Sequence, residues 1–257
     1  MKILLTGGMG FIGQNSLTEL RKVGTVEVWD LKNKRDIFSD SFSKAVKDSD
    51  AVVHLAALTS VAKSFKKPED TLRTNILGTA RVALLCQKYK KKLIYPSSAA
   101  VYYPDLSPYA TSKKIAEDIV RSIKGAVILR FYNVFGPNMN PDSGSIMYNF
   151  LTSDKLVVFG DGEQTRDFIH VRDVARILRE SFKKKWNDKI VDVGTGQSYS
   201  ANYVAGLFSH YRGIPIEYRP PQREIKWSIA DTTMLKTLYN KPLTTNLDKD
   251  ISVLCQN

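Results

Sequence analysis

Short apolar runs alternate along the chain with longer segments in which apolar positions recur every three or four residues. A short, uniformly apolar run is typical of a strand that is buried on both faces, and the longer recurrence is typical of an amphipathic helix. Because the two patterns alternate, they predict an α/β fold, a doubly wound parallel sheet with helices on both of its faces.

The pattern predicts six strands and five helices. We expect strands at Lys2–Thr6, Thr25–Asp30, Ala51–Leu55, Lys92–Ser97, Ala126–Phe131 and Lys189–Val193. We expect helices near Phe11–Val23, Phe42–Lys47, Thr71–Tyr89, Tyr109–Ile123 and Val171–Lys184. From Asn133 onward the alternation loosens and Pro, Gly and Asn cluster at 136–144. This change predicts a main domain of residues 1–133 plus 168–195 and a small C-terminal lobe of residues 134–167 plus 196–257.

The 257-residue chain has a net charge of +12. Basic runs at 88–92 and 183–185 lie where helices should end, and cations are favourable there because they oppose the helix dipole. We therefore interpret these runs as solvated helix ends. The remaining excess of positive charge suits an anionic substrate. Nucleic acid and an acidic membrane surface are the alternative partners. We predict neither of these alternatives.

The chain shows no sign of a membrane span, a leader or a metal site. No apolar run approaches the ~20 residues that a membrane helix needs, and the apolar run at the start is too short for a signal peptide. Cys86 and Cys255 lie far apart without the spacing of metal ligands. The sequence therefore predicts a cytoplasmic protein with reduced cysteines and no metal.

The first predicted strand runs into a glycine-rich turn, Thr6-Gly7-Gly8-Met9-Gly10-Phe11-Ile12-Gly13, and a helix follows. Glycines permit a tight turn and let backbone N–H groups approach a pyrophosphate at the N-terminus of the helix. A turn with packing roles only is the alternative. The strand–turn–helix context favours a bound dinucleotide.

Asp30 closes the second predicted strand, seventeen residues after Gly13. A carboxylate at this place can bind the ribose hydroxyls of adenosine and repel a 2′-phosphate, which favours NAD over NADP. A turn cap is the alternative role for Asp30. The nearby Lys32, Lys34 and Arg35 would still tolerate NADP.

A hydroxyl, a phenol and an amine occur in one short stretch as Ser98, Tyr109 and Lys113. Tyr109 and Lys113 are four residues apart and therefore share one face of the predicted helix. A phenol has a pKa of about 10, and a neighbouring cation lowers that pKa by stabilising the phenolate. The stretch predicts a Tyr that takes a proton from an alcohol, with Ser98 as its hydrogen-bond partner, if a hydride acceptor binds nearby.

Further motifs follow in order: His54-Leu-Ala-Ala57, Asn75-Ile-Leu-Gly-Thr, Ser97–Tyr102, Arg130-Phe-Tyr-Asn133-Val-Phe-Gly-Pro137, Gly160–Phe168, Val193–Gly196, Arg223 and Ala230-Asp231. Together with the glycine turn and the Ser, Tyr and Lys residues, they resemble the extended short-chain dehydrogenase/reductase superfamily. The resemblance is to its NAD-dependent nucleotide-sugar epimerases and dehydratases, and it covers nearly the whole chain.

The resemblance implies a Rossmann-type NAD-binding domain with a substrate-binding lobe, and a catalytic set of Ser98, Tyr109 and Lys113. It implies that NAD is bound by Gly7, Gly10, Phe11, Ile12, Gly13, Asp30, Asp36, Ile37, Leu55, Ala56, Ala57, Asn75 and Lys113. It implies that a nucleotide-diphosphate sugar is bound by Asn133, Arg166 and Arg223, although a surface ion pair is the alternative for each arginine. His54 and His170 are interpreted as structural. A homodimer is expected through the helices near 75–89 and 109–123.

Two alanines narrow the expected reaction. Dehydratases of the superfamily carry an acidic pair directly after the catalytic Ser or Thr, where this chain has Ala99 and Ala100. We therefore expect a 4-epimerase of the UDP-glucose/UDP-galactose type, N-acetyl forms included. The alternatives are another nucleotide-sugar oxidoreductase (a reductase or dehydratase) and a catalytically idle NAD- or RNA-binding regulator. Only six residues separate Tyr102 from Tyr109, fewer than in relatives of the superfamily. We expect this short loop to make the sugar end of the pocket more open to solvent.

Overall fold

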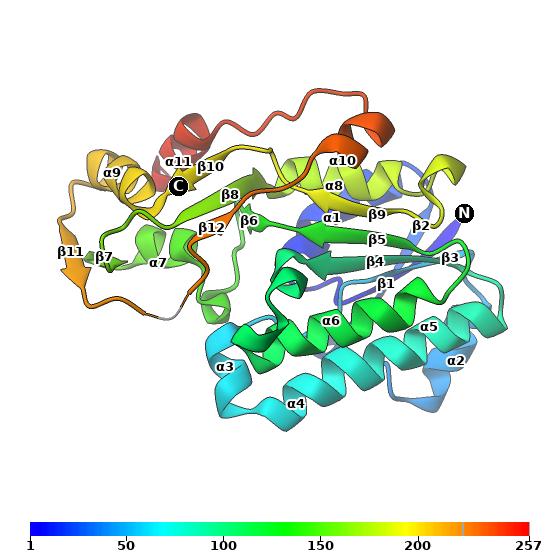
Figure 1. The fold of residues 1–257 in the computed structure, drawn as a ribbon. Helices are drawn as coiled ribbons and strands as arrows, with labels where there is room; N and C mark the ends of the chain where they lie inside the picture. Colours follow the sequence, from blue (N-terminus) through cyan, green and yellow to red (C-terminus); the bar gives the residue numbers. More distant parts are fainter. Residues whose placement is uncertain (223, 257) are drawn as a thin grey trace.

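The computed structural model describes residues 1–222 and 224–256, and its centre is a six-stranded parallel sheet with the order β2-β1-β3-β4-β5-β9 (Figure 1). The strands are β1 (Lys2–Thr6), β2 (Thr25–Trp29), β3 (Ala51–His54), β4 (Lys92–Ser98), β5 (Val127–Phe131) and β9 (Ile190–Val193). All six agree with the predicted bounds to within one residue, and the α/β fold class is confirmed. β2 lies on one side of β1, and β3 and the later strands lie on its other side. The direction in which strands are added to the sheet therefore reverses between β1 and β3.

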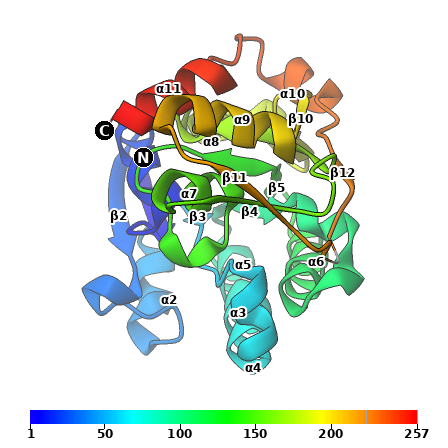
Figure 2. The ribbon, with the colours of Figure 1, turned by 90° about the vertical axis from the view of Figure 1, so that its left-hand side faces the viewer.

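Helices cover both faces of this sheet (Figures 1 and 2). On one face α1 (Phe11–Arg21), α8 (Val171–Glu180) and α10 (Thr233–Leu238) share a buried apolar core with the strands. On the other face α2 (Asp40–Lys47), α5 (Thr79–Lys88) and α6 (Pro108–Arg121) share a second core. The strands are mostly apolar, as expected for a sheet that is covered on both faces.

The helix predicted at Thr71–Tyr89 is interrupted. It consists of α4 (Pro68–Leu72) and α5, joined by a π-helical segment at Arg73–Gly78, and the short α3 (Val61–Lys66) precedes it. A π-helical turn widens the hydrogen-bonding ladder and occurs frequently at functional sites. Here it contains Asn75, one of the predicted site residues.

A smaller layer of structure lies at the C-terminal ends of the central strands (Figure 1). A third apolar core fills it, built largely from β7, α7, α9 and α11. Its elements are β6 (Asn133–Phe135), α7 (Ile146–Thr152), β7 (Leu156–Phe159), β8 (Thr165–His170), β10 (Ser198–Ser200), α9 (Ala201–Arg212), β11 (Ile216–Arg219), β12 (Trp227–Ser228) and α11 (Leu247–Gln256). The predicted division of the chain into two domains stays a prediction.

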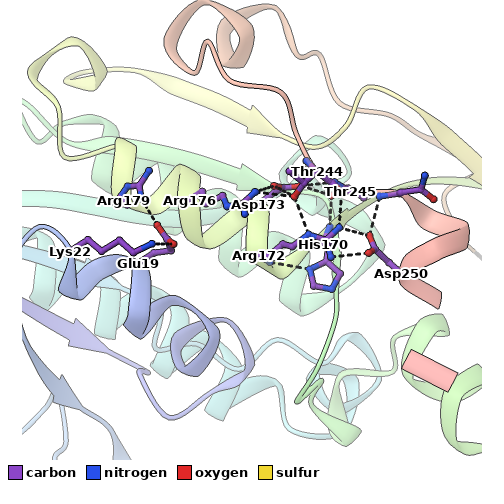
Figure 3. Close-up of polar contacts among 11 residues, drawn as sticks. Glu19, Lys22, His170, Arg172, Asp173, Arg176, Arg179, Thr244, Thr245 and Asp250 are labelled. Carbon is purple, nitrogen blue, oxygen red and sulfur yellow. Dashed lines mark hydrogen bonds and ion pairs between the residues drawn. The ribbon is translucent and has the colours of Figure 1, made fainter. Parts of the chain in front are cut away.

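Polar contacts attach the C-terminal segment to α8 (Figure 3). Asp173 is fully buried and accepts hydrogen bonds of 2.7–2.9 Å from the backbone and hydroxyl groups of Thr244 and Thr245. Arg172 forms an ion pair with Asp250 of α11 (2.7 Å). These contacts connect the smaller layer to the central sheet, because α8 packs directly on that sheet.

Candidate active site

The glycine-rich turn lies where β1 and β3 diverge, at the C-terminal edge of the sheet. Gly7 has a φ of +66°, and a Cβ built on it would lie 2.6 Å from the backbone nitrogen of Ala56. A Cβ on Gly13 would lie 2.6 Å from the carbonyl oxygen of Gly7. The turn therefore packs backbone against backbone, and these two positions have no room for a side chain.

The N-terminus of α1 is open to an anion. Gly10 is its N-cap, no side chain caps this end, and the first turn, which begins with Phe11 and Ile12, contains no acidic residue. Its backbone N–H groups therefore lack side-chain partners and carry the positive end of the helix dipole. Such an end is suited to a pyrophosphate group.

Asp30 lies at the end of β2, beside this turn. Its carboxylate accepts hydrogen bonds from the backbone nitrogens of Met9 (3.0 Å) and Lys32 (3.0 Å), so it caps a turn and also holds the glycine-rich loop. Asp36 accepts a hydrogen bond from the backbone nitrogen of Phe38 in the same loop (2.9 Å), and Ile37 is buried close to α5. The contacts of Asp30, Asp36 and Ile37 with a dinucleotide stay predictions.

The segment Leu55–Ala57 continues β3 alongside the glycine turn. The backbone nitrogen of Leu55 donates to the carbonyl oxygen of Thr6 (3.1 Å), and that of Ala56 donates to the Thr6 hydroxyl (3.3 Å). The small side chains of Ala56 and Ala57 leave room for a cofactor to lie close to this edge of the sheet. The structure thus brings this segment and the glycine turn together, as the sequence predicts.

β4 and one face of α6 bring the three predicted catalytic residues together. Ser98 ends β4, and its hydroxyl acts on the phenol of Tyr109, near the start of α6, in the direction that lowers the pKa of the phenol. One helical turn later, Lys113 donates from Nζ to the carbonyl oxygen of Pro96 (2.8 Å). Ser107 starts α6 by capping it, with its hydroxyl accepting a hydrogen bond from the nitrogen of Ala110 (3.1 Å).

Lys113 is almost fully buried, and its side chain is only partly protonated near neutral pH. Burial lowers the pKa of its amine to about 7, with Glu117 acting in the opposite direction. Its Nζ also lies 4.3 Å from the centre of the Tyr95 ring, which favours the cationic form. At a pKa of about 7, the two forms are about equally populated at neutral pH.

The lowered pKa predicted for Tyr109 is wrong for the chain alone. Burial raises the pKa of this phenol above its ordinary value, and the hydrogen bond with Ser98 offsets only part of that effect. The physical reason is that the phenolate loses its water, while Lys113 directs its amine to Pro96 and is only partly charged. A further positive charge close to the phenol would act against this effect of burial and lower the pKa of Tyr109.

A buried polar network lies behind the catalytic residues, and sequence reasoning missed it. Glu117, the next residue on the same face of α6, is fully buried and pairs with Arg130 of β5 (2.6 Å). Arg130 donates to the hydroxyl of Tyr102 (2.6 Å), which donates to Asp192 of β9 (2.9 Å), and Asp192 also accepts from Tyr132 (2.9 Å). The one sign of this network in the sequence is that a Glu follows Lys113 by four residues, which places both on the same face of the helix.

Asn75 holds three elements in place around this site. Its side-chain oxygen accepts from the nitrogen of Leu58 (2.9 Å), and its amide nitrogen donates to the carbonyl of Leu58 (3.0 Å) and to the hydroxyl of Ser112 (2.9 Å). Ser112 in turn donates to the carbonyl of Tyr109 (2.7 Å). Asn75 thus orients a backbone group, and its contact with the cofactor stays a prediction.

Both histidines in the predicted motifs make internal contacts. His54 lies between the hydroxyls of Thr6 (2.8 Å) and Thr79 (3.1 Å), and burial lowers its pKa to about 3. His170 caps α8 by accepting from the nitrogen of Arg172 (3.1 Å), and burial lowers its pKa to about 4. These contacts agree with a structural role for each.

The predicted substrate-binding residues lie in and beside the smaller layer. Asn133 donates to the carbonyl of Asp167 (3.0 Å), and Arg166 pairs with Glu224 (2.7 Å). Glu224 also lines a cavity of about 360 Å³ together with residues of α7, β7 and β11. Arg223, the second predicted arginine, lies outside the described residues. The ion pair of Arg166 is the alternative that the sequence left open.

Comparison with known proteins decides the family. The model of the NAD dependent epimerase/dehydratase family matches residues 3–194. The chain belongs to this family. The extended short-chain dehydrogenase/reductase resemblance, the Rossmann-type fold and the NAD cofactor are thereby confirmed.

Individual relatives of the epimerase/dehydratase chain are similar over most of its length. The chain is 30% identical to the UDP-N-acetyl-alpha-D-glucosaminuronate decarboxylase of Bacillus cytotoxicus, over 79% of this chain and 78% of that protein. It is 27% identical to the UDP-glucose 4-epimerase of Bacillus subtilis, over 92% of this chain and 90% of that protein. Among solved structures it is similar to MoeE5 in complex with UDP-glucuronic acid and NAD, with a TM-score of 0.90, 27% identity, and 100% of this chain and 98% of that chain covered.

The glycine turn of this epimerase/dehydratase chain fits NAD. A Cβ would fill the space at Gly7 and Gly13, and the end of α1 beside them offers uncapped N–H groups to a diphosphate. We expect the turn to hold the pyrophosphate of NAD and Asp30 to hold its adenosine ribose.

The role of the turn is tested by Gly7→Ala. We expect at least about tenfold weaker NAD binding, because a Cβ at φ +66° costs about 1–2 kcal/mol and lies 2.6 Å from Ala56. Isothermal titration calorimetry with NAD measures the effect. The matched control is Gly206→Ala in α9, where a Cβ meets nothing within 4 Å. Equal NAD affinities for the two variants would contradict the assignment.

Proposed function

We propose that the chain is an NAD-dependent nucleotide-sugar 4-epimerase of the UDP-glucose/UDP-galactose type. The observation that supports this most is a complete set of Ser98, Tyr109 and Lys113 directly beside Ala99 and Ala100. The set provides a hydroxyl, a phenol and an amine for reversible oxidation of an alcohol. The two alanines supply no group for the proton transfers of an elimination, which opposes the dehydratase alternative.

The proposed roles follow from the contacts in the site. Tyr109 takes the proton of the C4 hydroxyl through its phenol oxygen, and Ser98 binds the same sugar oxygen. NAD, when bound, supplies a reversible hydride acceptor for that carbon. Lys113 stabilises the phenolate by its charge. Tyr109 returns the proton after the sugar has presented its other face, so C4 is inverted and the sugar undergoes no net oxidation.

Arg166 is the side chain that we propose for the diphosphate of the substrate. Its guanidinium is paired with Glu224 in the structure (2.7 Å), so the diphosphate has to compete with this carboxylate. Guanidinium groups bind phosphate oxygens in a bidentate manner, which supports the exchange. We assign the same ligand to Asn133 and to Arg223, and the neighbouring cavity to the nucleoside.

A panel of nucleotide sugars with product analysis by NMR tests the proposal. We expect interconversion of UDP-glucose and UDP-galactose, or of their N-acetyl forms, in the presence of NAD. A UDP-uronic acid in the same panel tests decarboxylation, the activity in the name of one relative. Decarboxylation or net reduction without epimerisation would replace the proposal by the oxidoreductase alternative. If no nucleotide sugar of the panel is converted, the alternative of a catalytically idle NAD-binding regulator would replace the proposal.

We further propose a homodimer that pairs α5 and α6 with their counterparts. Leu84 of α5, Ile115 of α6 and Leu77 of the π-helical segment before α5 are exposed by 60%, 41% and 58%, and an apolar face of this kind is typical of an interface. We expect Leu77→Asp combined with Leu84→Asp to give a monomer in light scattering after size exclusion. Val253→Asp, an exposed apolar residue on α11, is the control. A wild-type monomer would contradict the dimer.

The cytoplasmic location of the protein also stays a prediction.

A further inference from the structure

Most of the net positive charge of the chain is found at one end of the central sheet. The connections 88–92, 121–125 and 179–189 lead from the ends of α5, α6 and α8 to β4, β5 and β9, at the N-terminal edge of the strands (Figure 1). They contain eleven Lys and Arg residues against two Asp and Glu residues, a net charge of +9 in twenty-one residues. The whole chain carries +12, so this basic end holds most of it.

The three connections are neighbours in space. β4, β5 and β9 are adjacent strands. The amine of Lys92, in the first connection, donates to the carbonyl of Phe182 (3.0 Å) and the side-chain oxygen of Asn187 (2.8 Å) in the third. The backbone nitrogen of Asp188, also in the third, donates to the carbonyl of Ala126 (2.9 Å), just after the second. Adjacent strands lie about 4.8 Å apart, less than the Debye length of about 8 Å in physiological salt. The charges therefore act as one patch.

Stabilisation of helix ends does not account for this patch. The helix dipole acts only within the last turn, whereas Lys90, Lys124, Lys184 and Lys189 lie beyond the last residues of α5, α6 and α8. All four are exposed, and no ion pair to a carboxylate occurs for them within residues 1–222 and 224–256. Mutual repulsion of these cations favours a partner that supplies the opposite charge. The patch also lies at the opposite edge of the sheet from the glycine turn, so it does not bind the substrate.

We propose that the basic end binds the surface of a membrane that contains anionic phospholipids. Nine of its eleven cations are Lys, which attract head groups as point charges. Its aromatic side chains are not available to stack on bases, because Trp186 is fully buried and Phe182 and Tyr89 pack against the apolar cores. The three connections expose no large apolar side chain, so the contact is with head groups only. Bound in this way, the chain keeps its glycine turn and catalytic residues at the edge of the sheet that lies away from the membrane.

Cosedimentation with lipid vesicles tests the proposal. We expect the wild-type chain to bind vesicles of phosphatidylcholine with one-third phosphatidylglycerol, less strongly as salt increases, and not to bind pure phosphatidylcholine vesicles. The triple variant Lys124→Glu, Lys184→Glu, Lys189→Glu is expected to lose affinity for the anionic vesicles by at least about tenfold. Circular dichroism and turnover in solution should equal those of the wild type, because all three residues lie away from the catalytic set.

The matched control is Lys66→Glu, Lys236→Glu, Lys249→Glu, three exposed residues outside the basic end with the same total change of charge. We expect this control to stay within about threefold of the wild-type affinity. Equal losses in the two triple variants would overturn the patch in favour of net charge alone. Absence of binding to anionic vesicles at physiological salt, or tighter binding of a single-stranded RNA at that salt, would overturn the membrane as partner.

Discussion

Replacing Tyr109 by Phe is expected to lower the turnover of the nucleotide sugar by about 10²–10⁴-fold, the range for loss of a positioned proton-transfer group. NAD binding should be retained, because the glycine turn and Asp30 lie on other elements. The variant keeps the aromatic ring in the first turn of α6 and removes only the phenolic hydroxyl. Single-turnover kinetics together with calorimetric titration of NAD separate the two effects.

The pH dependence of the same pair of proteins adds a second measurement. Burial raises the pKa of Tyr109 in the chain alone, and the phenolate is the form that takes the proton. Turnover of the wild type should therefore increase with pH up to the pKa of Lys113, about 7, where loss of the ammonium ends the increase. The residual turnover of the Phe variant should lack this increase. Tyr89→Phe removes a phenol that bonds Ser43 at the far end of α5 and serves as the control. Unchanged turnover in Tyr109→Phe would remove this residue from the mechanism.

The central sheet was predictable because each of its strands is buried on both faces. A strand such as β3, Ala51–His54, has only apolar or internally bonded side chains, and such a run is visible in the sequence without knowledge of its neighbours. The glycine turn was predictable for a similar reason, since its position between β1 and α1 is set by local sequence. The predicted site residues that came together, Ser98, Tyr109 and Lys113, lie on two elements that follow one another along the chain.

The contacts that sequence reasoning missed join elements that are far apart in the chain. Glu117 and Arg130 meet only because α6 packs against β4 and β5, and Asp192 reaches them from β9. The raised pKa of Tyr109 depends on burial, which a motif does not encode. The basic end has the same origin: three lysine-rich connections look like separate helix ends until the strand order places them side by side.

Replacing Glu117 by Gln is expected to lower the free energy of unfolding by about 3 kcal/mol, because it leaves the Arg130 guanidinium partly buried without its carboxylate. This is the lower part of the range for broken buried ion pairs, since Arg130 keeps Tyr102 (2.6 Å) and Asp192 (3.8 Å). Urea unfolding measures the change. Asp118→Asn, in an exposed pair with Lys114 on the same helix, is the matched control and should cost at most about 0.5 kcal/mol.

The Gln variant should also change the pH profile of the enzyme, which a loss of stability alone would not do. Glu117 raises the pKa of Lys113, so its neutral replacement should move that pKa below about 7 and reduce the protonated fraction at neutral pH. Because the ammonium stabilises the phenolate of Tyr109, the ascending limb of kcat/KM against pH should level off at a lower pH in Glu117→Gln and at an unchanged pH in Asp118→Asn. An unmoved limb in both variants would show that Glu117 supports the fold without tuning Lys113. A moved limb would assign to the buried pair of Glu117 and Arg130 the positioning of charge behind the catalytic residues.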